Sequence, residues 1–288
     1  MQAFLRHAGA VWRLLGERHL GLIAAGVAFF AMLAIFPAVA ALIALVGFWA
    51  DPVAVEDTLN ILADFLPQEA YGVVSDQVER LTGAADGTLG LASIVSLLVA
   101  TWSARLGVGA LIQGISAIYG AAPRSGLKGT VLALLMTLLL IGVGMIAVAG
   151  MLIAPIVLAI IERFIPSDSW VTLIGELVRW IVALAAVIVG LGFFYRYGPN
   201  CPADRRAPFL SPGLFLALLL WGGTSLALSI YVANFANYNE IYGSIGAVIA
   251  LMMWLYISTY AVLIGAALNF VSEYGDTLDQ ETGAENSG

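Results

Sequence analysis

Long runs without a charged side chain dominate the chain. Four of them contain at least 31 residues each, and they cover 20–50, 129–161, 208–239 and 241–272. A helix needs about 20 apolar residues to cross a hydrocarbon layer about 30 Å thick. Each run is therefore long enough for one membrane-crossing helix, with further residues left for the membrane interface or for a loop.

Two shorter apolar segments predict two further crossings. Residues 88–104 form an uncharged run of 17 residues, and 180–195 form one of 16 residues. Residues 170–179 extend the apolar face of the second run backwards, interrupted by Glu176 and Arg179. Residues three apart lie on the same side of a helix, so we expect these two to form a structural ion pair at the membrane interface.

Together the six segments predict an all-α fold, a polytopic membrane helix bundle with one transmembrane domain over 20–272. The expected crossings are about 20–50, 88–108, 129–161, 170–195, 208–234 and 242–272. An even number of crossings puts both termini on the same side of the membrane.

Lysine and arginine set the expected orientation of this bundle. Eight of the twelve basic residues fall on the side of the termini, namely Arg6, Arg13, Arg18, Arg124, Lys128, Arg196, Arg205 and Arg206. Three fall on the other side (Arg80, Arg163 and Arg179), and Arg105 is assigned to neither. Basic residues favour the cytoplasmic side of the membrane. We therefore expect both the N-terminus and the C-terminus in the cytoplasm.

Three polar segments flank or interrupt the crossings. Residues 1–19 place apolar side chains on one helical face beside arginines, which predicts an amphipathic helix on the cytoplasmic membrane surface. Residues 51–87 carry eight acidic residues and one basic residue. They predict a helical external segment, either a packed cap on the membrane or a lid over an opening. Residues 273–288 are acidic and predict a disordered cytoplasmic tail.

Composition narrows the class of function. The chain is 61% hydrophobic and only 11% charged, whereas soluble domains carry about 25% charged residues, so a water-soluble enzyme and a disordered protein are excluded. The net charge of −7 disfavours nucleic acid as a partner. Cys201 is the single cysteine, and both histidines precede the first apolar run. We therefore predict no catalytic residue, no cofactor and no metal site, and we do not expect an enzyme.

Arg105 is the first candidate for a functional site. An arginine at the centre of a membrane helix costs about 2.5–3.5 kcal/mol on insertion scales, so such a residue indicates a function. In one interpretation the helix ends near Arg105, whose side chain then reaches the cytoplasmic headgroups. In the other the helix continues to Tyr119, and Arg105 lies deep enough to bind an anionic headgroup within the bundle.

A polar and aromatic block between the last two crossings is the second candidate. With Arg105, the residues expected to bind a substrate or headgroup are Asn234, Asn237, Tyr238, Asn239 and Tyr242. Their amides and hydroxyls can bind a sugar or a phosphate, or they can satisfy the backbone of a tight turn. Pro37 and Pro155 fall inside crossings and are candidate helix breaks, a feature that lines binding sites in many transporters.

Several of these segments resemble the YihY/BrkB family of bacterial inner-membrane proteins. They are GVAFFAMLAIFP at 26–37, WSAR at 102–105 with IYG at 118–120, YRYGPN at 195–200, YVANFANYNEIYGSIG at 231–246, WLY at 254–256 and GAALN at 265–269. The chain departs from the family where Ala34, Ser116 and Ala267 replace the usual Ser, Asn and Glu. The missing Glu argues against proton coupling at that position.

The resemblance implies a six-helix, multi-pass protein of the bacterial inner (plasma) membrane. It suggests lipid or glycolipid transport and envelope resistance as roles. The family has also carried the label ribonuclease BN. The acidic net charge of the chain argues against binding of RNA and so against this label. We therefore predict a transporter for a lipid, a glycolipid or another small polar or amphiphilic solute. The alternative is a non-transporting scaffold for envelope assembly or resistance. The expected partners are membrane lipids and the cargo, with a homo-oligomer as an open alternative.

Overall fold

The regular secondary structure in the described part of the chain is helical, and this part contains no strand. The computed structural model describes residues 2–49, 88–122, 124–164, 169–202, 205–234 and 238–285. Its helices are α1 (Gln2–Glu17), α2 (Leu20–Trp49), α5 (Thr88–Ile118), α6 (Gly126–Phe164), α7 (Ser169–Tyr197), α8 (Pro212–Asn234) and α9 (Tyr238–Glu285). The predicted external segment 51–87 lies outside the described residues.

Five of these helices are long and apolar enough to cross a membrane. The qualifying stretches are Ile94–Ile118, Gly126–Ala147, Leu177–Tyr197, Pro212–Tyr231 and Val248–Tyr274. A sixth is obtained if α1 and α2, which are bent by 63° relative to each other, are counted as one broken crossing. The prediction of an all-helical membrane bundle is thus confirmed, with five or six candidate crossings in the described residues.

The bend between α1 and α2 lies at His19. This residue has a φ of +50°, the left-handed region that non-glycine residues rarely adopt, and so it ends one helix before the next begins. On α1, Val11, Leu14 and Leu15 are buried, whereas Trp12 is 79% exposed. The buried face packs against α9. The two faces expected for 1–19 are present, and its position on a membrane surface stays a prediction.

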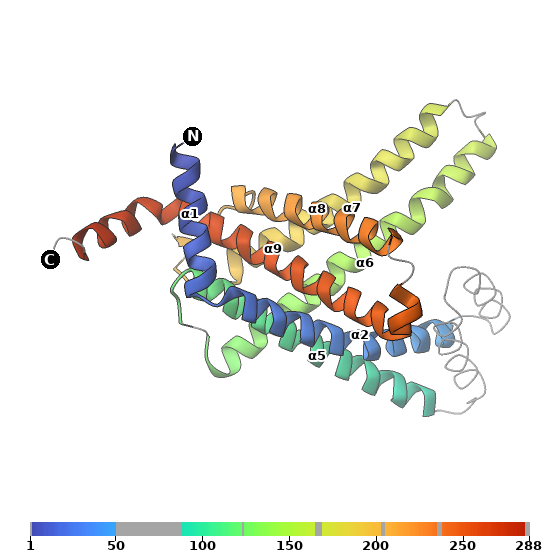
Figure 1. Ribbon diagram of the computed structural model, residues 1–288. Coiled ribbons are helices and arrows are strands. Elements are labelled where there is room, and N and C mark those ends of the chain that lie inside the picture. The colour runs from blue at the N-terminus through green and yellow to red at the C-terminus, as the bar shows by residue number, and fades with distance from the viewer. Residues whose placement is uncertain are drawn as a thin grey trace.

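The helices pack as neighbouring pairs around α9. Helix α2 lies along α5, α6 along α7, and α8 along α9, while α9 also contacts α1, α2 and α5. Both termini lie at one end of the bundle, together with the α5–α6 and α7–α8 connections (Figure 1). The end of α6, the start of α7, the end of α8 and the start of α9 lie at the other end. We call the end that holds both termini the termini end. It contains the segments that carry most of the basic residues.

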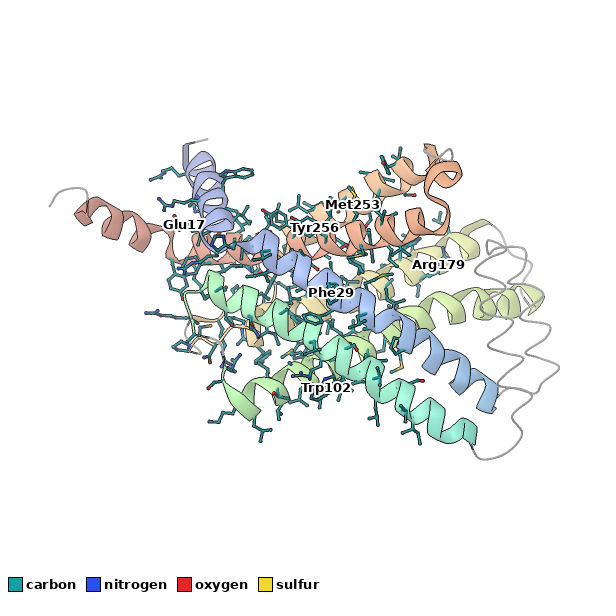
Figure 2. All side chains as sticks on the ribbon, turned by 60° about the horizontal axis from the view of Figure 1, so that its bottom comes forward. Glu17, Phe29, Trp102, Arg179, Met253 and Tyr256 are labelled. Carbon is teal, nitrogen blue, oxygen red and sulfur yellow. The ribbon has the colours of Figure 1, made fainter. Side chains whose placement is uncertain are left out.

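The core is made of large side chains near the termini end and small ones between the helices. Tyr195, Phe194, Ile115, Leu214 and Leu263 are fully buried or nearly so. The outer surface is apolar instead of polar: Phe29, Trp102 and Met253, labelled in Figure 2, are each at least half exposed. An apolar exterior of this extent is costly in water and is the surface expected against lipid.

Two hydrogen bonds and a close approach hold α7, α8 and α9 together. The Tyr195 hydroxyl donates to the Val262 carbonyl at 2.7 Å, and the Gly213 N–H donates to Asn269 Oδ1 at 2.7 Å. Gly213 and Gly265 face each other so closely that a side chain on either would meet the backbone of the other. Small residues allow this spacing, as in other membrane helix pairs.

Three features differ from the sequence prediction. First, α5 continues as one helix to Ile118, ten residues beyond the predicted boundary at 108. Second, α2 and α6 run through Pro37 and Pro155 without a break, so neither proline divides its helix. Neighbouring groups in a membrane helix can satisfy the carbonyl that proline leaves free, which explains why the helix survives.

The third difference concerns the tail. Helix α9 continues to Glu285, so most of the segment predicted as a disordered tail is helical. Extending an existing helix requires no new nucleus, and Leu278, Gln280 and Glu281 are good helix formers. The acidic composition alone was therefore a poor guide to the local structure here.

Candidate functional site

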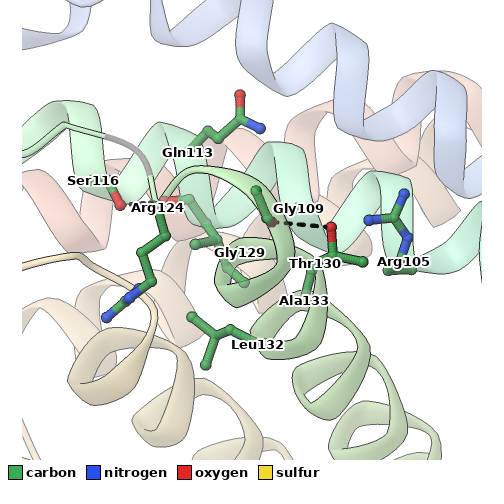
Figure 3. Close-up of a pocket in the computed structure, with 11 residues that line it drawn as sticks. Arg105, Gly109, Gln113, Ser116, Arg124, Gly129, Thr130, Leu132 and Ala133 are labelled. Carbon is green, nitrogen blue, oxygen red and sulfur yellow. Dashed lines mark hydrogen bonds between the residues drawn. The ribbon is translucent and has the colours of Figure 1, made fainter.

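A cavity of about 330 Å³ lies between α5 and the start of α6 (Figure 3). Its lining residues are Arg105, Gly109, Ile112, Gln113, Ser116, Arg124, Gly126, Gly129, Thr130, Leu132 and Ala133. This volume is at the lower end of the range of small-molecule sites, about 300–1,000 Å³. The cavity can therefore hold a small solute or the headgroup of a lipid.

Helix α5 supplies one wall of the cavity from a single face. Arg105, Gly109, Ile112 and Ser116 recur at intervals of four, three and four residues, which is the spacing of one helical face. Arg105 stands 13 residues before the end of α5 at Ile118, or about 20 Å along the axis at 1.5 Å per residue. It therefore lies near the middle of the candidate crossing, as in the second interpretation of the sequence.

The guanidinium of Arg105 is stacked but incompletely hydrogen-bonded. Its central carbon lies 4.2 Å from the centre of the Trp102 ring, a cation–π contact that fixes the side chain. Its Nε is buried and, among the described residues, has no hydrogen-bond partner. A buried donor without a partner costs free energy, more so when it carries charge. An anion in the cavity would balance this charge and so offset part of its cost.

Arg124 lines the same cavity from the α5–α6 connection and also holds the end of α7. Its Nη1 donates to the Gly198 carbonyl at 2.7 Å, and its Nη2 donates to the Pro199 carbonyl at 3.0 Å. A cation at this position suits the negative end of the α7 dipole. Burial and the nearby charge of Arg206 lower the pKa of Arg124. The same side chain thus joins the cavity to the α7–α8 connection.

The start of α6 forms the third part of the wall. Gly126 has a φ of +63°, a conformation that favours glycine, and Thr130 Oγ1 donates to the Gly126 carbonyl at 3.4 Å. Gly129 has no room for a side chain, because one would meet the Arg124 carbonyl. The first N–H groups of a helix lack intrahelical acceptors and carry partial positive charge. This end of α6 therefore adds to the positive potential in the cavity.

The YRYGPN segment at 195–200 ties the connections together beside the cavity. Asn200 Nδ2 donates to the Ala122 carbonyl at 2.8 Å, and the Asn200 N–H donates to Ser116 Oγ at 3.3 Å. Ser116 is itself buried and donates to the Ile112 carbonyl at 2.8 Å. These contacts give the family-like segment a positioning role: they fix the α5–α6 connection that carries Arg124.

The charge of the lining is one-sided although the whole chain is acidic. Arg105 and Arg124 are both cationic, and none of the residues that line the cavity in the described part of the chain is Asp or Glu. Within that part there is also no group of three or more His, Cys, Asp or Glu placed to hold a metal ion. The lining offers hydrogen-bond donors and positive charge, which suit an anion.

The other predicted site residues belong to the end of α8 and the start of α9 or to the segment between them. Asn234 ends α8, and Tyr238, Asn239 and Tyr242 belong to the first turns of α9. Their side chains and all of Asn237 lie outside the described residues. In Figure 1 the end of α8 and the start of α9 lie at the opposite end of the bundle from the α5–α6 connection that borders the cavity. A role in ligand binding for these residues stays a prediction.

The predicted ion pair at α7 also stays a prediction. The side chain of Glu176 lies outside the described residues. Arg179 is half-buried, and its guanidinium carbon lies 5.8 Å from the centre of the Trp180 ring. This contact is a cation–π interaction at the longer end of the usual range.

Sequence reasoning missed Arg124 and the start of α6 as parts of the site. Arg124 was counted only as one of the basic residues on the side of the termini. The signal for the α5 wall was present in the spacing of Arg105, Gly109, Ile112 and Ser116. It was overlooked because the crossing was predicted to end at 108, before Ile112 and Ser116.

Comparison with known proteins identifies relatives over nearly the whole chain. The family model described as virulence factor BrkB matches residues 11–287. The ribonuclease-like protein YfkH of Bacillus subtilis is 25% identical over 246 residues, which is 85% of this chain and 87% of that protein. The matched relatives include membrane proteins of the UPF0761 group. No solved structure matches the chain.

Two UPF0761 membrane proteins match over shorter segments. The one from Idiomarina loihiensis is 29% identical over 130 residues, 45% of this chain and 44% of that protein. One from Xanthomonas campestris is 25% identical over 209 residues, 73% of this chain and 48% of that protein. The chain thus spans about half the length of these relatives and most of the length of the Bacillus protein.

Proposed function

The chain belongs to the BrkB family of membrane proteins, and from this premise we propose that it transports a small polar or amphiphilic solute, such as a lipid or glycolipid. We further propose that it does so in the bacterial inner membrane with both termini in the cytoplasm. The basic residues of the termini end support this orientation, because positive charge favours the cytoplasmic face.

The observation that carries the proposal is Arg105 near the middle of a candidate membrane crossing, facing a cavity. A charged side chain at this depth costs about 2.5–3.5 kcal/mol on insertion scales and marks a solute path in many membrane proteins. A protein that only needed to pack its helices would gain stability from an apolar residue here. The cation is therefore best explained by a ligand that uses it.

The surface around the cavity suits an amphiphile. Trp102, which stacks on Arg105, is 57% exposed, and Leu135 on α6 is 58% exposed. A polar headgroup can occupy the cavity while an acyl chain lies along such apolar side chains in the lipid. With the headgroup in the cavity and the acyl chain in the lipid, moving the headgroup into the membrane costs less free energy. The headgroup then exchanges its hydrogen bonds with water for hydrogen bonds with donors in the cavity.

The ribonuclease-like name belongs to the Bacillus relative. An RNA-binding protein needs basic side chains on an exposed surface to neutralise successive phosphates. Here the net charge is −7, and Arg105 lies inside the bundle. We therefore extend no ribonuclease activity to this chain.

Reconstitution into liposomes tests the proposal. We expect the purified protein to accelerate the crossing of at least one probe: fluorescent phosphatidylglycerol, a fluorescent neutral glycolipid or radiolabelled glycerol 3-phosphate. The rate with Arg105→Gln is expected to fall at least tenfold. The matched control is Arg205→Gln, which removes one charge from an exposed residue of the same end and should leave the rate unchanged. If no probe crosses faster than in protein-free liposomes, the proposal is wrong and the scaffold alternative is favoured.

A further inference from the structure

The chemistry of the cavity narrows the class of cargo. Resting on the proposed function, we propose that the transported solute carries a phosphate group and that Arg105 and Arg124 bind this phosphate in the cavity between α5 and α6. The first N–H groups of α6 complete the site. Nothing in the family match or in the names of the relatives specifies such a ligand.

Three separate sources of positive potential border the cavity. They are the guanidinium of Arg105, that of Arg124 and the N-terminal turn of α6 at Gly126–Gly129. Figure 3 shows the two arginines on opposite sides of this turn. A phosphate is tetrahedral and accepts hydrogen bonds in several directions, whereas a carboxylate presents two oxygens in one plane. Donors that approach from different elements therefore favour a phosphate.

The two arginines have donors to spare. A guanidinium has five N–H groups, and the described contacts of Arg124 use only its Nη1 and Nη2 for the Gly198 and Pro199 carbonyls. Arg124 can therefore keep the end of α7 in place and still donate to a ligand. Arg105 has a buried Nε without a partner in the described structure, and Trp102 holds its guanidinium in place. Both side chains are thus positioned before the ligand arrives, which lowers the entropic cost of binding.

The start of α6 resembles other phosphate-binding helix ends in its use of glycine. Gly126 adopts a positive φ, whereas the space where a Gly129 side chain would lie is filled by the Arg124 carbonyl. The first N–H groups of a helix are common donors to phosphate. Thr130 and Gln113 add neutral hydrogen-bonding groups to the lining. The site can therefore neutralise the charge and satisfy several oxygen atoms at once.

The depth of the two arginines suggests a route for the phosphate. Arg124 lies in the connection at the termini end, and Arg105 lies deeper, near the middle of the candidate crossing; both line the same cavity. A phosphate that enters beside Arg124 can pass to Arg105 and stay close to a positively charged group along the way. The second arginine thus extends the favourable potential into the part of the membrane where an isolated anion would be least stable.

Equilibrium binding tests the inference without requiring transport. The purified full-length protein in detergent is titrated with short-chain phosphatidic acid, the matching diacylglycerol, the matching fatty acid and inorganic phosphate, and binding is followed by native mass spectrometry and thermal shift. We expect phosphatidic acid to bind at least tenfold more tightly than diacylglycerol and more tightly than the fatty acid. Arg105→Gln should weaken phosphatidic acid at least tenfold, and Arg105→Lys should weaken it less.

The controls separate the site from general charge effects. Arg205→Gln should bind phosphatidic acid as the wild type does. Because Arg124→Gln removes a support of α7 and can unfold the protein, Arg124→Lys is the second variant, and we expect it to fold and to bind more weakly. Inorganic phosphate distinguishes the source of the group: if it binds as tightly as phosphatidic acid and depends on Arg105, the ligand is a soluble phosphate compound.

Failure of this inference differs from failure of the proposed function. Equal binding of diacylglycerol and phosphatidic acid, tighter binding of the fatty acid, or unchanged binding in Arg105→Gln would each overturn the phosphate site. Any of these results is compatible with transport of an uncharged glycolipid in liposomes. Conversely, tight binding of phosphatidic acid without any transport would support the phosphate site and contradict the proposed function.

Discussion

The charged side chain of Arg105 costs folding free energy, and the packing of the helices does not require it. This residue lies near the middle of a candidate crossing, and its Nε has no partner among the described residues. Residues that serve a ligand are often unfavourable for stability, because the groups that await the ligand stay unsatisfied without it. This trade-off distinguishes a binding residue from a structural one.

Replacing Arg105 should therefore stabilise the protein while impairing its function. For Arg105→Met we expect the free energy of unfolding in detergent to stay equal or to rise by about 1–3 kcal/mol, because a partly buried charge is replaced by an apolar chain of similar length. Thermal unfolding followed by circular dichroism measures this change. A marked fall in the melting temperature would instead show that the stacking of Arg105 on Trp102 supports the fold.

The crossing of α8 and α9 depends on the absence of side chains at one point. A Cβ on Gly265 would lie within contact of the Tyr195 hydroxyl, the Gly213 carbonyl and Ala217. Most of these neighbouring groups belong to the backbone or to buried side chains, which cannot move aside easily. Gly222, also in a membrane helix, has no other group within 4 Å of the corresponding position.

These two glycines form a matched pair for mutation. We expect Gly265→Ala to destabilise the protein by about 1–3 kcal/mol through overpacking. Gly222→Ala should have no effect or a small stabilising one, because alanine favours a helix more than glycine does. Unfolding of the two variants in the same detergent checks the difference. Equal stability of the two would mean that the close contact between α8 and α9 does not occur in the folded protein.

Hydropathy predicted the helices well because the thickness of the hydrocarbon layer fixes their length. It failed where tertiary contacts alter the cost of a single residue. The boundary at 108 rested on the cost of a buried Arg105, and the sequence does not reveal that Trp102 and a cavity accommodate this charge. Helix α2 likewise continues through Pro37, although the residue alone favours a break.

The candidate site was only partly predictable for the same reason. Arg105 stood out because charge is rare within the crossings. Arg124 lies in a connection among other basic residues, and only the folded structure shows that it borders the same cavity and binds the Gly198 and Pro199 carbonyls. Sequence spacing groups residues on one helix, but it does not tell which connection folds against that helix.

In the whole molecule the basic residues and the apolar surface occupy different regions, and this arrangement fits the proposed function. Both termini and two connections lie at one end, with most of the basic residues. Between the ends the surface is apolar, and the cavity brings two cations from the termini end into the bundle. The account therefore requires that water and small anions reach the cavity from the cytoplasm, whereas the outer face of α6 contacts only lipid.

Two positions at equal depth allow a direct test of this arrangement. Gly109 lines the cavity nine residues before the end of α5, and Leu135 lies nine residues after the start of α6 and is 58% exposed. Each is therefore about 13 Å along its helix from the termini end. A Cβ on Gly109 fits, because its nearest neighbour, the Ala133 Cβ, is 3.8 Å away. Both substitutions to cysteine are made in a background with Cys201→Ser.

Labelling of these two cysteines with a membrane-impermeant maleimide is the most direct measurement. The account predicts that Gly109→Cys reacts in inside-out membrane vesicles, that the reaction is slow in right-side-out vesicles, and that short-chain phosphatidic acid protects it. Leu135→Cys should stay unlabelled in both kinds of vesicle. Equal labelling of the two positions, or labelling of Gly109→Cys only in right-side-out vesicles, would contradict a cavity that opens to the cytoplasm within a membrane bundle.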